Sequence, residues 1–389
     1  MPISKAYLKQ IEKVGGVIVS QSKWLKTVCV QCEDKKLVEE YKKLPFVEDV
    51  SMVWRSEKEK IKETAFSAIS SQERKKSDHS FEDYGEAWKN ISLHQGQLLH
   101  ESGFRGKGID IAVIDAGFID LPNNPVLNTI QIKGAKSFIY EDLNPYNTDS
   151  HGVWVIACMA TNSPGYYVGV APEANYWLLR SEDSSGNFLV EEDYWAAAVE
   201  YADSVGVDVV NTSLYYLWND WPFPSHKSEE MDGKTVLSTR AANVAADKGI
   251  LIVCCAGNDG AWLASPADSP NVLTVGSVND KGWIGAFTAY GITADGRMKP
   301  DVVSLGQLAC TIDTGGKIDF RNGTSYASPI MCGLAACLWQ AYPELTNREL
   351  LDILKRAADR YNAPELPYGC GIVNIQRAME LAADVLSRG

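Results

Sequence analysis

The stretch from Arg321 to Pro329, Arg-Asn-Gly-Thr-Ser-Tyr-Ala-Ser-Pro, decides how the rest of this chain is interpreted. Asn-Gly is a tight-turn signal, and the apolar run over 330–341 that follows predicts a buried helix. Ser325 is therefore expected at or just before the start of that helix, where unpaired N–H groups and the helix dipole would stabilise an oxyanion. Pro329 is expected in the first helical turn, which tolerates proline. A serine before a helix is more commonly only an N-cap, so a catalytic role requires a base, a carboxylate and an oxyanion donor elsewhere.

The composition is that of an ordinary globular protein. The chain has 389 residues, of which 45% are hydrophobic and 22% charged, and this length predicts one large domain and a small one. The net charge of −13 argues against nucleic acid and anionic membranes as partners, because both attract clustered Lys and Arg. No apolar run reaches eighteen residues, so no membrane span is predicted. A monomer is expected.

The N-terminal part predicts a small α+β domain over residues 1–55. Its expected elements are a helix over 3–15, strands over 17–20 and 27–32, a helix over 34–44 and a strand over 46–54. This order is that of a ferredoxin-like unit without its first strand. The N-terminus lacks the continuous apolar core of a secretory signal, so the chain is either cytosolic or begins after a signal that has been removed.

Residues 56–82 are dense in Lys, Glu, Ser, Arg and Asp, which predicts an exposed linker. Beyond it, over 83–389, near-continuous apolar runs alternate with helical patterns. The runs typical of buried strands are 108–115, 176–180, 207–211, 250–255 and 272–276, and the helical patterns are 151–161, 191–205 and 234–248. Such alternation predicts a three-layer α/β domain with a mostly parallel sheet covered on both faces.

Three further polar residues lie where these elements end or begin. Asp115 ends the first apolar strand, His151 opens a helix, and Asn258 directly follows the strand over 250–255. Each has an ordinary structural explanation, as a turn aspartate, a structural histidine and a turn asparagine. Functional groups of parallel sheets nevertheless gather at the carboxyl ends of strands, and Asp, His and Ser in this chain order form one of the known catalytic triads.

With these residues in place, the chain resembles the subtilisin-like serine peptidases, the subtilases. The resemblance rests on Ala-Val-Ile-Asp-Ala-Gly over 112–117, His151-Gly152, Ala-Gly-Asn over 256–258 and Gly-Thr-Ser-Tyr-Ala-Ser-Pro over 323–329, and it extends over about residues 83–385. It implies that Ser325 is the nucleophile of a peptide-bond hydrolysis, that His151 is the base, that Asp115 orients the base, and that Asn258 donates to the oxyanion.

The resemblance also implies a substrate-binding cleft. Its walls would be Ser213-Leu214-Tyr215 on one side and Cys255-Ala256-Gly257 on the other. Two residues depart from the family pattern. Tyr215 stands where the family commonly has glycine and is expected to narrow or cap the cleft, whereas Val153 replaces the usual threonine after His151-Gly152 and is expected to matter less.

By the same resemblance, residues 1–55 are expected to be a propeptide that assists folding and blocks the active site. The linker over 56–82 would then carry the maturation cut, and the enzyme would be secreted or at the cell surface. No cofactor is expected to be required. Calcium is common in the family and Asp120 lies near an expected ligand position, but a full oxygen cage, which needs six to eight oxygens, is not apparent in the sequence.

Two other functions compete with a peptidase. One is a non-catalytic binding protein on a subtilase scaffold, with the cleft held blocked by the N-terminal domain. Tyr215 favours it weakly, and the presence of all four candidate catalytic residues argues against it. The other is a nicotinamide-dependent enzyme, which is disfavoured because Gly106 and Gly108 precede the first strand instead of following it.

Overall fold

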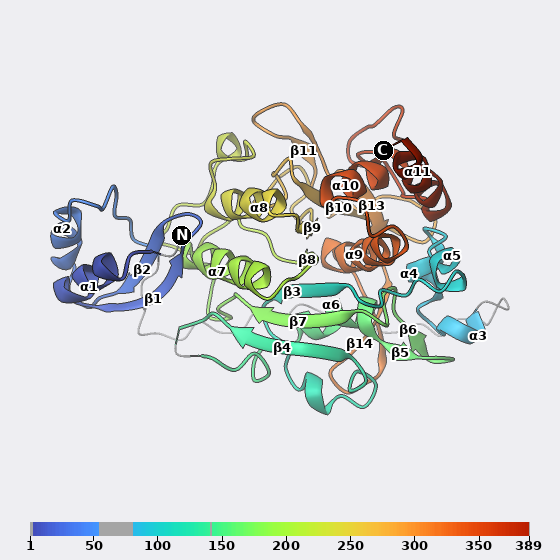
Figure 1. The fold of residues 1–389 in the computed structure, drawn as a ribbon, viewed down its shortest axis with the longest axis horizontal. Helices are drawn as coiled ribbons and strands as arrows, with labels where there is room; N and C mark the ends of the chain where they lie inside the picture. Colours follow the sequence, from blue (N-terminus) through green and yellow to red (C-terminus); the bar gives the residue numbers. More distant parts are fainter. Residues whose placement is uncertain (1–2, 54–80, 141, 389) are drawn as a thin grey trace.

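The computed structural model describes residues 3–53, 81–140 and 142–388. Its centre is a seven-stranded sheet with the order β13-β10-β9-β8-β3-β7-β4, and every pair of neighbouring strands is parallel (Figure 1). In this order the strands are Val302–Leu305, Val272–Val278, Leu251–Cys255, Val209–Thr212, Asp110–Asp115, Asn175–Arg180 and Gln131–Ser137. The predicted parallel α/β sheet is confirmed.

Helices cover both faces of the sheet, as the alternation of side chains along the strands requires. In β3, Ile111 and Val113 pack on the side of α6 and α9, whereas Ala112 and Ile114 pack on the side of α7 and α8. These helices are α6 (His151–Ala160), α9 (Thr324–Ala341), α7 (Val190–Ser204) and α8 (Leu237–Asp247). The result is the expected three-layer arrangement.

The last two helices, α10 (Asn347–Arg356) and α11 (Ile375–Arg388), pack near α9. The start of α10 is a capping box: the Thr346 hydroxyl accepts from the Glu349 N–H at 3.2 Å, and the Glu349 carboxylate accepts from the Thr346 N–H at 2.8 Å. The remaining short elements are α3 (Phe81–Tyr84), α4 (Trp88–Ser92), α5 (Gln97–Glu101), η1 (Leu121–Asn123), β5 (Asn162–Ser163), β6 (Tyr167–Val168), η2 (Ser228–Glu230), β11 (Gly291–Ile292), β12 (Met298–Lys299), β14 (Ala309–Ile312) and β15 (Ile318–Arg321).

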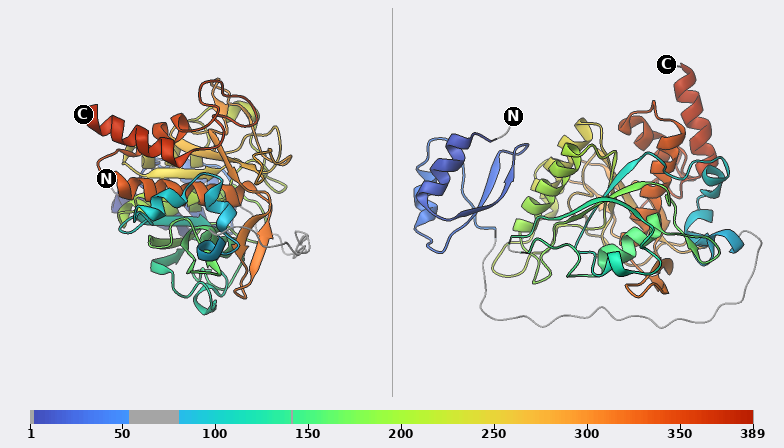
Figure 2. Two further views of the ribbon diagram at one scale, coloured as in Figure 1. Left: turned by 90° about the vertical axis from the view of Figure 1, so that its right-hand side faces the viewer. Right: turned by 60° about the horizontal axis from the view of Figure 1, so that its bottom comes forward.

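The N-terminal unit forms a separate small body on the flank of the large domain, beside α7 (Figures 1 and 2). It consists of α1 (Lys5–Val14), the antiparallel pair β1 (Val17–Ser22) and β2 (Thr27–Gln31), and α2 (Leu37–Lys42). The predicted α-β-β-α order is therefore confirmed.

The strand predicted over 46–54 is wrong for the residues described there. Residues 46–53 form no strand, and among the strands that the structure describes β1 pairs with β2 alone. The carbonyl oxygen of Val53 instead accepts a hydrogen bond from the N–H of Val190, at 3.1 Å, at the start of α7. The end of this segment thus bonds to the large domain and not to its own sheet. The linker predicted over 56–82 lies almost entirely outside the described residues.

Candidate active site

Asp115 is the last residue of β3, at the carboxyl end of the central strands. Its side chain is completely buried. One carboxylate oxygen, Oδ1, accepts from His151 Nδ1 at 2.7 Å and from the backbone N–H of Ala116 at 2.8 Å. The other oxygen, Oδ2, is buried without a hydrogen-bond partner among the described residues. The carboxylate of Asp115 and the ring of His151, both candidate catalytic groups, are therefore in direct contact.

His151 is the first residue of α6, and two local features fix its position. The carboxylate of Asp149 accepts from the backbone N–H of His151 at 2.7 Å. Gly152 lies against the loop after β3, where its N–H donates to the Gly117 carbonyl oxygen at 3.1 Å. A Cβ at position 152 would come within 2.4 Å of that oxygen, so only glycine fits behind the histidine.

The pair with Asp115 makes His151 unusually basic. Burial disfavours the charged imidazolium and lowers its pKa, but attraction to the Asp115 carboxylate and the hydrogen bond between them outweigh burial, with a smaller contribution from Asp149. Together they raise the pKa of His151 from 6.5 to about 9. Its side chain remains 26% exposed, so the ring is accessible from the solvent side.

Ser325 is the second residue of α9 and is 6% exposed. Its hydroxyl donates to the carbonyl oxygen of Ser213 at 3.3 Å; no hydrogen bond to His151 is formed in this structure. The start of α9 nevertheless lies close to His151, since the ring of Tyr326, the residue after Ser325, is 6.3 Å, centroid to centroid, from the ring of His151. Catalytic hydrogen bonds are often long or misaligned before substrate binds.

The prediction that Pro329 lies in the first turn of the helix is wrong. Since α9 begins at Thr324, Pro329 is its sixth residue. A proline there removes the N–H that would bond the carbonyl oxygen of Ser325, four residues earlier. That oxygen instead accepts a hydrogen bond from the Ser213 hydroxyl at 2.9 Å, so the helix keeps this acceptor satisfied through a neighbouring segment.

Asn258 follows β9 and is fixed by the start of α9. Its side-chain oxygen Oδ1 accepts from both the backbone N–H and the hydroxyl of Thr324, each at 3.0 Å. The single proton of this hydroxyl is shared with the Gly257 carbonyl oxygen, which lies 3.1 Å away. Because the amide oxygen is occupied, the NH₂ group of Asn258 is the end that can donate to a ligand beside Ser325.

The predicted walls of the cleft lie next to each other. Leu214 and Tyr215 follow Ser213 after β8, and the thiols of Cys254 and Cys255 approach the Leu214 carbonyl oxygen at 3.8 and 3.7 Å. On the other wall, Ala256 and Gly257 directly follow β9. The N–H of Ala256 donates to the carbonyl oxygen of Val275 at 3.0 Å. The N–H of Gly257 donates to the hydroxyl of Thr324 at 3.2 Å. The two segments therefore flank the start of α9.

Arg180 is a site residue that sequence reasoning missed. It ends β7 beside Asp115 and is only 2% exposed. Its Nε donates to the carbonyl oxygen of Ala116 at 3.0 Å, and its guanidinium is paired with Asp142. Burial opposes the charge on Asp142, but Arg180 lowers the pKa of that carboxyl overall. A charged residue at the end of an apolar strand was the signal available in the sequence.

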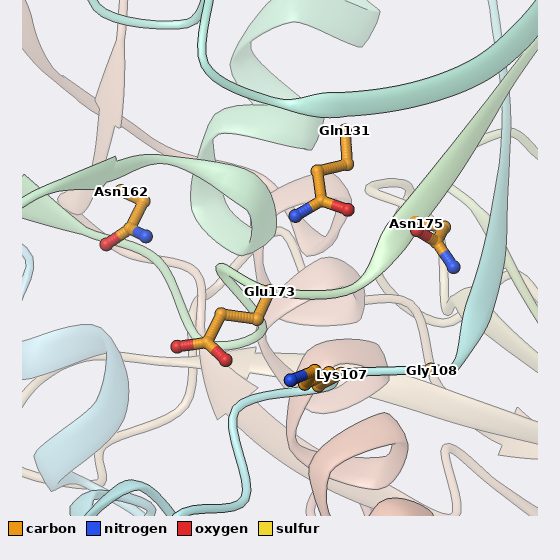
Figure 3. Close-up of a pocket in the computed structure, with 6 residues that line it drawn as sticks. All are labelled: Lys107, Gly108, Gln131, Asn162, Glu173 and Asn175. Carbon is orange, nitrogen blue, oxygen red and sulfur yellow. The ribbon is translucent and has the colours of Figure 1, made fainter.

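A hollow of about 520 Å³ lies at the other end of the sheet (Figure 3). Its lining residues are Lys107, Gly108, Gln131, Asn162, Glu173 and Asn175. Gln131 and Asn175 begin β4 and β7, so this hollow faces away from Asp115. Glu173 is already paired with Arg105 at 2.7 Å, and Asn175 with Asp110 at 2.6 Å. Glu173 and Asn175 are thus bonded to residues outside the lining, and the lining contains no histidine, serine or cysteine that could act as a nucleophile or base.

The residues that the structure describes contain no group of three or more His, Cys, Asp or Glu side chains arranged to hold a metal ion. Asp120, the carboxylate considered for calcium, is exposed at the start of η1. No helix in the described part of the chain is both long and apolar enough to cross a bilayer.

The N-terminal unit is held to α7 by one carboxylate in particular. Glu200 accepts from the hydroxyl of Ser22 and from the backbone N–H groups of Lys23 and Trp24, the last two at 3.2 and 3.0 Å. These groups belong to the turn between β1 and β2. Cys29 of β2 packs in an apolar cluster with Val190 and Tyr194 of α7, among others. The contact thus combines charge-assisted hydrogen bonds with apolar burial.

Comparison with known proteins identifies the family of the chain. Residues 106–372 match the Subtilase family, and residues 1–68 match the Peptidase S8 propeptide domain of Bacteroidota. Subtilisin E of Bacillus subtilis (strain 168) is 29% identical over 95% of this chain and 85% of its own length. Subtilisin J of Geobacillus stearothermophilus is 30% identical with the same coverage.

Solved structures share the fold. The MycP3 protease from the type VII (ESX-3) secretion system superposes with a TM-score of 0.61 at 22% identity, covering 77% of this chain and 88% of its own. MycP1 with its N-terminal propeptide removed gives 0.60 at 22% identity, covering 75% of this chain and 96% of its own. The family match spans most of the chain, and this protein therefore belongs to the subtilase family of serine peptidases, with an N-terminal S8 propeptide domain.

Proposed function

We propose that this protein is a serine endopeptidase that hydrolyses peptide bonds through an acyl-enzyme and is made as a zymogen. The observation that carries the proposal is the buried carboxylate of Asp115, which holds His151 Nδ1 at 2.7 Å beside the start of the helix that bears Ser325. A carboxylate that binds one ring nitrogen leaves the other nitrogen, Nε2, to take and return a proton.

In the proposed reaction, the hydroxyl of Ser325 turns from the Ser213 carbonyl toward His151 Nε2 when substrate binds. Its oxygen attacks the scissile carbonyl carbon while His151 removes the proton. The tetrahedral intermediate collapses when His151 returns that proton to the leaving amine, which breaks the C–N bond and leaves an ester on Ser325. Water then repeats the sequence and releases the acid.

The negative oxygen of each tetrahedral intermediate would be held by two donors, the NH₂ of Asn258 and the backbone N–H of Ser325. The Asn258 amide cannot easily turn the other way, because its oxygen accepts two hydrogen bonds from Thr324. A donor fixed before the reaction needs no reorganisation, and such a donor typically lowers the barrier by about 3 kcal/mol. Ser213, Leu214 and Tyr215 on one side and Cys255, Ala256 and Gly257 on the other would bind the substrate chain. We propose that the reaction needs no cofactor.

The N-terminal domain over 1–55 would serve as the enzyme's own inhibitor and folding aid. Its turn is bonded to Glu200 and its Val53 to the first turn of α7, so it has a specific seat on the domain over 83–389. The maturation cut is proposed within 56–82. We also propose that the enzyme acts as a monomer on protein or peptide substrates outside the cell or at its surface.

Intact-mass analysis of the purified chain before and after a fluorophosphonate probe tests this proposal. One adduct on a chain shortened by about the N-terminal unit is expected. Ser325→Ala should stay full-length and unlabelled. Ser328→Ala is a matched control, because its hydroxyl lies buried on the same helix and bonds to Asn211 at 2.8 Å; it should label and mature.

A full-length, unlabelled wild-type chain would contradict the proposal. It would favour the binding protein whose cleft stays blocked by the N-terminal unit. Deletion of residues 1–82 after folding of the whole chain, by an engineered protease site in 56–82, would then show whether labelling appears once the block is removed.

A further inference from the structure

The position of Tyr215 bears on which substrates the site accepts. If Ser325 attacks a carbonyl whose oxygen lies at Asn258, the residue that supplies this carbonyl must lie between the two walls of the cleft. Ser213 is hydrogen-bonded to Ser325 in both directions. On the other wall, Gly257 is bonded to Thr324 at 3.2 Å. If the side chain before the scissile bond enters between 213–215 and 255–257, as the family resemblance implies, the groups between these two walls decide which side chains fit.

The ring of Tyr215 already lies between these walls. Gly257 presents no side chain, and a Cβ built on it would be 3.6 and 3.7 Å from two carbon atoms of the Tyr215 ring. This is van der Waals contact. The face that a glycine would leave open for a substrate side chain is thus covered by the chain's own aromatic ring.

The ring is also held in place. Tyr215 packs against an apolar cluster separate from the main cores, made of Leu217, Met231, Val236, Leu263 and Ala264. Its hydroxyl lies close to the carboxylate of Asp259, and burial, followed by this negative charge, raises the pKa of the phenol. To swing outward, the ring would have to lose this packing, which for an aromatic side chain is a large part of its stabilisation.

We propose that Tyr215 fills the pocket for the residue before the scissile bond and restricts that residue to small side chains such as glycine, alanine and serine. This inference rests on the proposed peptidase function and adds to it a specificity determinant. A large aromatic residue at that position would have to displace the Tyr215 ring or leave its own side chain outside the pocket.

Two tetrapeptide p-nitroanilides that differ only in the residue next to the anilide, alanine or phenylalanine, test the proposal on the full chain after maturation. The wild-type enzyme is expected to prefer alanine in kcat/KM by about 10-fold or more, a range typical of steric discrimination in a pocket. Tyr215→Gly should open the pocket and reverse this ratio by about 10- to 100-fold. Tyr215→Phe, which keeps the ring and removes only the hydroxyl, should retain the preference for alanine.

Equal cleavage of both peptides by the wild type, with an unchanged ratio in Tyr215→Gly, would overturn the inference. So would loss of the preference in Tyr215→Phe, since the hydroxyl and not the ring would then select. Fluorophosphonate labelling of Ser325 separates this outcome from failure of the proposed function: a labelled enzyme without selectivity refutes only the pocket, whereas an unlabelled one refutes both. Tyr215→Ala replaces Tyr215→Gly if the glycine variant melts early.

Discussion

Two histidine–carboxylate pairs in this molecule have nearly the same geometry but different surroundings. His151 bonds to Asp115 at 2.7 Å, and His226, in the loop before α8, bonds to Glu192 on α7 at 2.6 Å. In the second pair every position is occupied. The other oxygen of Glu192 accepts from the N–H and the hydroxyl of Ser238, and the other nitrogen of His226 faces Glu230 at 3.7 Å.

The Asp115–His151 pair, called here the open pair, has atoms without partners in the described part of the chain at the positions that are occupied in the His226–Glu192 pair, called here the closed pair. Asp115 Oδ2 has no partner among the described residues, and the His151 ring, 26% exposed, faces the start of α9. A buried carboxylate beside a histidine therefore does not by itself define a catalytic site. The difference lies in what the second ring nitrogen of each histidine faces. That of His151, the proposed base, is proposed to face a reacting hydroxyl. That of His226 faces another carboxylate, so His226 is a structural link between α7 and a loop.

The sharpest test of this distinction removes each histidine in turn. His151→Ala is expected to lower kcat by about 10⁵- to 10⁶-fold, because the proposed base is lost. His226→Ala should change kcat/KM by less than about 3-fold, since it faces no reacting group. Peptide hydrolysis with the two purified variants measures both effects, and a comparable loss in both would refute the assignment.

The next test concerns the charge of Asp115 and the pH profile. His151 must be neutral to act as a base, and its pKa is raised to about 9, so kcat/KM of the wild type should rise with pH and reach half its maximum near pH 9. Asp115→Asn removes the attraction that raises the pKa and leaves the effect of burial. The midpoint should therefore move down by more than one pH unit, while the rate falls about 10⁴-fold.

A midpoint that stays in place in Asp115→Asn would show that another group controls the profile. Measuring the profile from pH 5 to pH 11 at saturating and at low substrate separates the free enzyme from its substrate complex.

Substitution of Asn258 tests the proposed donor to the oxyanion, which lies beside the Asp115–His151 pair. Asn258→Ala should lower kcat by about 10²- to 10³-fold with little change in KM, because the donor is used mainly when the oxyanion forms. A matched variant, Asn258→Asp, keeps an acceptor for Thr324 but loses the donors, so it should be no more active. A variant that raised KM with kcat unchanged would place Asn258 in ground-state binding instead.

The smallest effect is expected for the His226–Glu192 pair, where a substitution should change the stability of the fold and not the rate of hydrolysis. Burial lowers the pKa of His226, but Glu192, with help from Glu230, raises it overall above the usual value. Such a shift stabilises the folded state below the unfolded-state pKa, about 6.5, and the stabilisation is lost as pH rises through the folded pKa. In a Ser325→Ala background, His226→Gln should cost about 1–2 kcal/mol at pH 6 and clearly less above pH 9.

Thermal melts at the two pH values measure this difference. An equal loss of Tm at both would mean that His226 contributes by packing and not by its charge.

How much could be predicted from the sequence differs between these regions. Asp115, Asn258 and Ser325 were predictable because each lies directly beside an apolar run, and parallel strands bring their carboxyl ends to one edge. Arg180 was missed because its partner Ala116 lies 64 residues earlier in the sequence, after the neighbouring strand β3, and local patterns carry no information about such a partner. Asp149 bonds to the backbone N–H of His151 only two residues later, but a polar loop residue gives no sign in the sequence of which N–H group it binds.

The two structural errors have the same origin. The apolar residues over 46–54 suggest a strand, but the described part of this segment pairs with neither β1 nor β2, and Val53 bonds to the first turn of α7. Pro329 was predicted in the first turn of its helix but is the sixth residue. The position is tolerated because the Ser213 hydroxyl bonds to the carbonyl oxygen of Ser325, which the proline leaves without a helical partner. In both cases, the large domain supplied a hydrogen bond that local reasoning could not include.

The proline in α9 has a mechanical consequence. Because it removes one N–H, the backbone of Ser325 is tied sideways to Ser213, through the hydroxyl of Ser213 at 2.9 Å, and not only along its own helix. The segment proposed to bind the substrate chain and the residue proposed to attack it are therefore joined directly by a hydrogen bond. This bond fixes the backbone of Ser325 relative to the cleft wall before any substrate binds.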